Sequence, residues 1–173
     1  MRRLILALAC AALLPRLAGA QTGMSLGTAF ESGERYYRLG VALGGSFAPR
    51  SAGRVGMRFD LGMQAFDPHY KVCSYPCYPQ AVPSTSLIVV SSTANLVLAH
   101  RPLSESGFYL LAGLGAHWFA ATPYNDGTYL KLGWNGGGGV RLGSKLFAEV
   151  RYHGLIDPRL TRGFVPITLG FRF

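Results

Sequence analysis

Strict alternation of apolar residues with small or polar residues is the feature that most constrains the fold of this chain. In the last nine residues, 165–173 (VPITLGFRF), every second residue is apolar, and Pro166, Thr168, Gly170 and Arg172 fill the gaps. Successive side chains of a β-strand point to opposite faces, so this pattern predicts a strand with one wholly apolar face. Such a face needs a surface that buries it.

The same alternation recurs in seven earlier segments, which begin near residues 24, 37, 55, 88, 108, 130 and 146. An even number of alternating segments of about ten residues is typical of transmembrane β-barrels. In lipid every backbone N–H and C=O needs an internal partner, which excludes an open sheet. The sequence therefore predicts an all-β fold, a closed eight-stranded antiparallel up-and-down transmembrane β-barrel.

Charged residues fall only on the small-residue face of these segments, and the apolar face carries none. A Lys or Arg facing lipid at mid-depth costs about 2–4 kcal/mol, so the charged face should line the lumen. A soluble barrel of the lipocalin type would reverse this sorting. We expect ionised and small side chains to share the bore, with Asp60 and Glu149 each accepting from more than one cation. The expected lumen ion network comprises Arg38, Arg58, Asp60, Lys131, Arg141, Glu149, Arg151 and Arg172.

The first twenty residues have the three parts of a secretory signal peptide. Arg2 and Arg3 precede an apolar run of eleven residues, 4–14, and residues 18–20 (AGA) match a cleavage site. The apolar run is too short for a membrane-spanning helix, which needs about 20 residues. We predict a cleaved signal peptide at 1–20, followed by one outer-membrane β-barrel domain at 21–173.

The connections between the segments alternate in length. We expect outer loops at 31–35, 65–84, 121–127 and 156–163, and short turns at 48–53, 101–105 and 143–145. The longest loop, from Ala65 to Ser84, contains Cys73 and Cys77, and a C-x3-C pair in an oxidising envelope predicts a local disulfide. A zinc site with His69 is a weaker alternative, because a fourth ligand is not apparent. This loop is the candidate site for a surface ligand.

Several functions are not favoured by the sequence. The Arg residues are spread singly through the strand segments, whereas a nucleic-acid patch would cluster them on one element, so we expect no nucleic-acid partner. Ser91 or Ser92, His153 and Glu149 could supply the nucleophile, base and acid of a hydrolase. However, we expect Glu149 and His153 to face inward, away from lipid substrates. The glycine run 136–139 lacks the Lys-Ser/Thr of a phosphate loop; we expect these glycines to let the wall curve or a neighbour approach closely. We therefore predict no enzymatic activity, no cofactor and no bound metal.

Five segments carry a family resemblance: residues 93–102 (TANLVLAHRP), 108–119 (FYLLAGLGAHWF), 131–143 (KLGWNGGGGVRLG), 147–155 (FAEVRYHGL) and 164–173 (FVPITLGFRF). They resemble the small bacterial outer-membrane β-barrel proteins of the OmpA transmembrane-domain and OmpX type. The resemblance implies a barrel, expected to be monomeric, in outer-membrane lipid. It also implies folding by the outer-membrane assembly machinery, which would recognise the C-terminal aromatics Phe171 and Phe173. A structural or adhesin-like surface role is implied; a narrow, anion-preferring pore and a lipid-modifying enzyme remain as alternatives.

Overall fold

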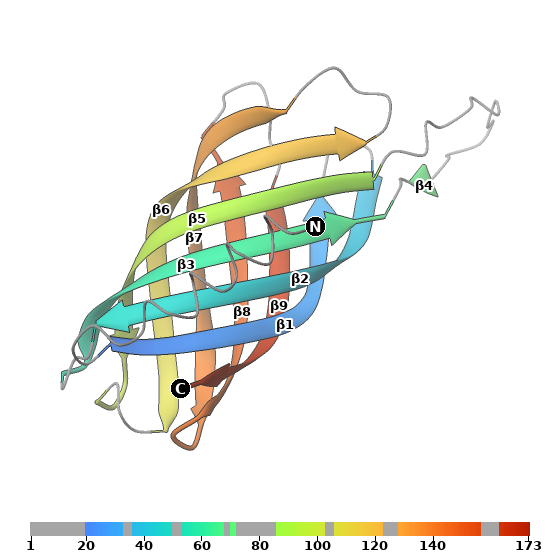
Figure 1. Ribbon diagram of the computed structural model, residues 1–173. Coiled ribbons are helices and arrows are strands. Elements are labelled where there is room, and N and C mark those ends of the chain that lie inside the picture. The colour runs from blue at the N-terminus through green and yellow to red at the C-terminus, as the bar shows by residue number, and fades with distance from the viewer. Residues whose placement is uncertain are drawn as a thin grey trace, which may run out of the picture.

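The computed structural model describes residues 20–32, 36–49, 53–67, 70–71, 86–102, 106–122, 128–156 and 163–173. The expected signal peptide lies outside these residues except for Ala20, which begins the first strand. Eight long strands and one short strand make up the described chain (Figure 1). They are β1 (Ala20–Ser32), β2 (Tyr36–Pro49), β3 (Val55–Phe66), β4 (Tyr70–Lys71), β5 (Ser86–Ala99), β6 (Gly107–Thr122), β7 (Tyr129–Leu142), β8 (Leu146–Leu155) and β9 (Gly163–Arg172).

The eight long strands form a closed antiparallel barrel. The sheet runs β1-β9-β8-β7-β6-β5-β3-β2, and β2 pairs with β1 again to close it. The closure is visible at Leu26 of β1, which lies opposite Leu43 of β2 on one side and Leu169 of β9 on the other. The predicted closed eight-stranded barrel is thus confirmed. No helix in the described part of the chain is long and apolar enough to cross a membrane.

Strand β4 is a feature that the alternation did not predict. Its residues were assigned to the loop from Ala65 to Ser84, but Tyr70 and Lys71 pair with Tyr37 and Tyr36 of β2. Backbone pairing therefore continues beyond the end of β3 at the end of the barrel that carries β4 (Figure 1). We call this the loop end, and we call the opposite end, with connections 50–54, 100–106 and 143–145, the turn end.

The apolar and polar faces of the strands lie as the alternation predicts. Large apolar side chains point outward along every long strand; Leu26, Leu114 and Leu169 are 61%, 65% and 68% exposed. Every charged strand residue whose side chain is described lies on the inner face. The predicted sidedness, with an uncharged outer face, is therefore confirmed.

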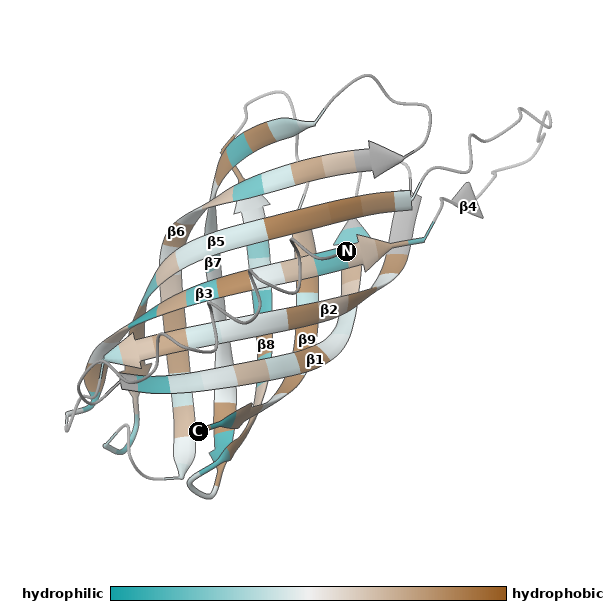
Figure 2. Ribbon diagram, in the orientation of Figure 1, coloured by the Kyte–Doolittle hydropathy of each residue, from teal (hydrophilic) through white to brown (hydrophobic). Residues whose placement is uncertain are grey.

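The bore differs from the prediction because large apolar side chains share it. Phe66, Leu87, Val89, Phe119 and Phe164 form a buried cluster at the loop end, where β5 is markedly apolar (Figure 2). A second cluster near the turn end contains Val97, Ala99, Tyr109 and Leu111. The expectation that only ionised and small side chains share the bore was wrong, because inward glycines leave space that larger inward residues fill.

Two residues shape the chain locally. Gly143 adopts a φ of 76° in the turn that joins β7 to β8, a conformation that side-chain-bearing residues rarely adopt. Pro166 lies in β9, and the pairing of β8 with β9 is interrupted beside it, between Val150↔Ile167 and His153↔Phe164. Proline has no N–H to donate, so the ladder loses a bond there without any change of register.

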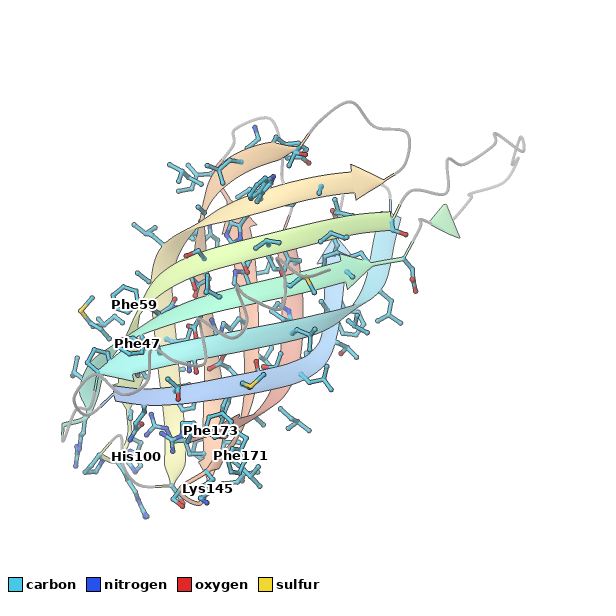
Figure 3. The ribbon with its side chains drawn as sticks, viewed as in Figure 1. Phe47, Phe59, His100, Lys145, Phe171 and Phe173 are labelled. Atoms are coloured by element: carbon cyan, nitrogen blue, oxygen red, sulfur yellow. The ribbon has the colours of Figure 1, made fainter. Side chains whose placement is uncertain are left out.

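Aromatic side chains gather on the outer face near both ends. At the turn end Phe47 lies opposite Phe59 on the neighbouring strand, and the rings of Phe171 and Phe173 are 5.3 Å apart (Figure 3). Toward the loop end the rings of Trp134 and Tyr152 are 5.3 Å apart. Two aromatic girdles that flank an apolar band are typical of barrels that span an outer membrane.

Candidate functional site

Four charged side chains cross the bore at its centre. Arg58 and Asp60 come from β3, whereas Glu149 and Arg151 come from β8, which is four strands away in either direction around the barrel. Arg58 Nη2 lies 2.7 Å from Glu149 Oε2, and Arg151 Nη1 lies 3.0 Å from Asp60 Oδ2. Each Arg also pairs with the acid on its own strand. We call these four residues the ion ring; it joins opposite walls of the barrel.

Two uncharged side chains complete the ion ring. Asn95 Nδ2 donates to Asp60 Oδ2 at 2.6 Å, and the Tyr109 hydroxyl donates to Glu149 Oε2 at 2.6 Å. Asp60 Oδ2 thus accepts from Arg58, Arg151 and Asn95. Asn95 and Tyr109 were absent from the lumen network inferred from the sequence, although their inward position in the alternation could have indicated them.

Tyr109 reaches Glu149 across an intervening strand. In the cross-strand row, Gly139 of β7 lies between Tyr109 of β6 and Glu149 of β8. A Cβ at Gly139 would lie 2.5 Å from the Tyr109 ring and hydroxyl, so only glycine leaves this path open. Gly139 therefore permits the close approach of a neighbour, which is one of the two roles that the sequence indicated for the run 136–139.

The other cations of the expected network are not members of the ion ring, although Arg141 lies against Tyr109. Arg141 places its guanidinium carbon 5.0 Å from the centre of the Tyr109 ring, and Arg172 donates to Gln21 Oε1 and to the Ser144 carbonyl, both at 3.2 Å. Lys131 Nζ lies 5.9 Å from the centre of the Tyr129 ring. Arg38 is opposite Glu31 in the pairing of β1 with β2, and its side chain lies outside the described part.

An aromatic plug, formed by Phe66, His117, His153 and Phe164, fills the bore between the ion ring and the loop end. His153 stacks on Phe164 with ring centres 4.6 Å apart, and His117 meets both rings edge-on at 5.3 and 5.5 Å. Phe66 packs edge-on against Phe164. His117 is fully buried, and neither of its ring nitrogens has a hydrogen-bond partner among the described residues.

Little open space remains inside the described barrel. A cavity of about 50 Å³ lies beside Arg58, Arg141 and Arg172, and one of about 40 Å³ lies beside Asp60 and Glu149. Each has room for one or two water molecules, because one water occupies about 30 Å³ in the liquid. The ion ring and the aromatic plug thus close the bore at two levels.

The residues considered for a hydrolase are not assembled into one. Ser91 faces inward and its hydroxyl donates to the Gly62 carbonyl at 3.4 Å, whereas Ser92 faces outward. His153 Nδ1 has no hydrogen-bond partner among the described residues, and Glu149 is engaged by Arg58 and Arg151. The geometry of a nucleophile, a base and an orienting acid is not formed by these side chains.

The remaining expected sites lie at the two ends. Cys73 and Cys77 fall outside the described residues, so their pairing stays a prediction. Phe171 and Phe173 lie at the turn end, where Lys145 Nζ is 5.6 Å from the Phe171 ring centre (Figure 3). The backbone N–H of Phe173 donates to the Thr22 carbonyl at 2.8 Å, which ties the last residue to β1.

Solved structures of small outer-membrane barrels share this fold. Neisserial surface protein A is 18% identical over 90% of this chain and 96% of its own, with a TM-score of 0.61. Ail of Yersinia pestis, in complex with the heparin analogue sucrose octasulfate, is 14% identical over 90% of this chain and 99% of its own, with a TM-score of 0.54. The N-terminal β-barrel domain of Pseudomonas aeruginosa OprF is 13% identical over 89% and 99%, with a TM-score of 0.51.

The similarity to these proteins is one of fold. No protein-family model matches the sequence, and a search of curated proteins returned no significant match. The chain thus has the eight-stranded architecture of the OmpA and OmpX type that its sequence resembles.

Proposed function

We propose that this chain is an integral protein of a bacterial outer membrane with a structural or surface-interaction role. The observation that carries the proposal is the closed barrel whose outer face is apolar and uncharged between two aromatic girdles, as far as the chain is described. An outer face of this kind is stable only against hydrocarbon, since exposed apolar patches on this scale promote association in water. The barrels that share the fold support the same location.

The filled bore argues for a non-enzymatic, non-conducting barrel. The ion ring ties β3 to β8 across the full width of the bore, and the aromatic plug lies between it and the loop end. A conducting path would have to displace both. Surface interaction therefore falls to the outer loops, with the connection from Ala65 to Ser84 as the longest of them.

Membrane location and closure are tested together by heat-modifiable migration. The chain with its signal peptide is expressed in a Gram-negative host, and the outer-membrane fraction is run on a detergent gel with and without boiling. We expect an unboiled band that migrates faster than the boiled one, because a closed barrel resists the detergent at room temperature. Recovery of the chain in the soluble fraction would contradict the proposal.

The loop assignment is tested by replacing residues 72–85 with a short glycine-containing turn, so that β3, β4 and β5 keep their residues. Heparin is the first probe, because Ail has been crystallised with a heparin analogue. Immobilised heparin should retain cells that display the unaltered barrel. Cells that display the loop variant should not be retained, although the variant barrel should remain heat-modifiable. Equal retention by both proteins would refute a role for this loop in binding heparin.

The disulfide belongs to the same proposal. We expect Cys73 and Cys77 to be joined in the exported protein, because the outer loops face an oxidising compartment. Peptide mass mapping without reductant should yield a single fragment that carries both cysteines as a disulfide, two mass units lighter than the reduced form. Free thiols on the protein recovered from the outer membrane would contradict this expectation.

A further inference from the structure

A long groove runs across the outer face of β5 to β9 near the turn end. It has a volume of about 720 Å³. Residues that lie opposite one another on β6, β7 and β8 form two outward-facing rows beside the groove. One row is Leu110, Gly138 and Val150, and the other is Phe108, Val140 and Ala148. Gly138 has no side chain and Ala148 has only a methyl group, so these two residues form the floor between larger neighbours. The groove is a depression in the surface that the proposed function places in lipid.

The length of the groove is comparable with that of one lipid chain. Neighbouring strands lie about 4.8 Å apart, so a groove that crosses five strands is about 19 Å long. One leaflet of the hydrocarbon core is about 15 Å thick, half of about 30 Å, and an acyl chain extends over that depth. Short turns of outer-membrane barrels face the periplasm, so the turn end should lie on the periplasmic side. We propose that the groove is a binding site for one acyl chain of a phospholipid of the periplasmic leaflet, an inference that rests on the proposed membrane location.

Charge at the turn end specifies the lipid headgroup. His100 lines the groove where β5 ends, and Arg101 follows it with an exposed side chain beside Gly107. Lys145 is exposed on the next turn (Figure 3). Among the described turn residues at this end, Arg54, Arg101 and Lys145 carry positive charge, whereas residues 103–105, which include Glu105, lie outside the described part of the chain. A phosphate at the mouth of the groove therefore meets donors and positive charge, so the site is suited to an anionic phospholipid such as phosphatidylglycerol.

The experiment is native mass spectrometry of the complete mature barrel, refolded in detergent micelles and exposed to a few equivalents of palmitoyl-oleoyl phosphatidylglycerol. We expect one retained phospholipid per barrel. Ala148→Leu raises the floor of the groove and should abolish that adduct. Ala94→Leu is the matched control, because Ala94 also points outward, from β5 outside the groove, and its variant should retain the lipid as the unaltered barrel does.

Further variants separate the parts of the site. Leu110→Ala removes a side chain from the wall of the groove and adds no bulk to the protein. It should weaken retention of the phospholipid, and it provides a test even if Ala148→Leu fails to fold. Arg101→Gln should reduce the preference for phosphatidylglycerol over phosphatidylcholine, and an unchanged preference would overturn the headgroup assignment. Equal retention by Ala148→Leu and Ala94→Leu would overturn the acyl-chain site. If the unaltered barrel and Ala94→Leu form a dimer and Ala148→Leu does not, the acyl-chain site is also overturned, because the groove would then hold a second copy of the chain.

The outcome is distinguishable from a failure of the proposed function. Heat-modifiable migration of each variant reports closure, and incorporation into phosphatidylglycerol vesicles reports membrane insertion, independently of a retained lipid. A barrel that inserts but retains no phospholipid refutes only the groove. A barrel that does not insert refutes the membrane location itself.

Discussion

The hydroxyl of Tyr109 donates a 2.6 Å hydrogen bond to Glu149 across a strand to which neither residue belongs. Gly139 of that strand lies beneath the Tyr109 side chain and makes the contact possible. Glu149 is 3% exposed and also binds both arginines of the ion ring. The Glu149 carboxylate thus accepts from Arg58, Tyr109 and Arg151, and these contacts join strands β3, β6 and β8.

Replacing Glu149 by Gln should strongly destabilise the barrel. The amide leaves Arg58 and Arg151 with Asp60 as the one remaining acid of the ion ring, and breaking a buried ion pair costs about 3–5 kcal/mol. The loss should appear as a lower urea midpoint of unfolding in phospholipid vesicles. Arg54→Gln, at an exposed residue before β3, is the control and should leave the midpoint unchanged. A Glu149→Gln barrel as stable as the control would show that the ion ring contributes little.

Replacing Gly139 by Ala should break the Tyr109–Glu149 hydrogen bond. The new methyl group would lie 2.5 Å from the Tyr109 hydroxyl, so the ring must move. A hydrogen bond to a charged group contributes about 2 kcal/mol, and urea unfolding should register a loss of that order. Gly136→Ala is the matched control in the same run, because the nearest atom to its Cβ is 3.9 Å away in Trp134. Equal stabilities of the two variants would count against the role of Gly139.

A charge on the outer face should be costly in proportion to its depth. Leu114→Arg, in the middle of β6, should cost about 2–4 kcal/mol, whereas Leu146→Arg, beside the turn end, should cost about 0–1 kcal/mol. Both leucines point outward and are more than half exposed. Urea unfolding in vesicles gives the two values. Costs that do not differ would mean that the outer face does not lie in hydrocarbon.

The aromatic plug and the ion ring should prevent conduction. Planar-bilayer recordings of the unaltered barrel should show no discrete current steps, because the two internal cavities near the ion ring measure only about 50 and 40 Å³. Phe164→Ala removes the ring that contacts Phe66, His117 and His153. This variant should lower the free energy of unfolding in vesicles by about 3–5 kcal/mol. Regular steps of conductance from the unaltered protein would revive the narrow anion-preferring pore.

Removing the last aromatic ring should impair assembly in cells more than stability in vitro. Phe173→Ala keeps the backbone hydrogen bond to the Thr22 carbonyl, so the closed barrel should still form when the protein is refolded into vesicles. The heat-modifiable band in the outer-membrane fraction should nevertheless decrease, if the assembly machinery recognises this ring. A Phe30→Ala variant, with an outward ring on β1, is the control and should assemble normally. Normal assembly of Phe173→Ala would remove this residue as the signal.

Alternation along the sequence determined much of the fold, because the direction of a strand side chain depends only on whether its position is odd or even. This local rule placed Leu26, Leu114 and Leu169 outside and Arg58 and Glu149 inside, and the absence of charge on the outer set made closure necessary. It did not distinguish among inward residues. The large inward rings of Phe66 and Phe164 therefore went unnoticed as a plug.

Which inward side chains meet across the bore was decided only by the tertiary structure. Arg58 and Glu149 are 91 positions apart and come from opposite walls, so their contact depends on the accumulated stagger of every strand between them. The same stagger aligns Gly139 with Tyr109, and it places Gly138, in the floor of the groove, opposite Leu110 in its wall. The sequence alone determined the faces of the strands, because side-chain direction is local. The barrel determined the partners, because register around a closed sheet is a property of all eight long strands together.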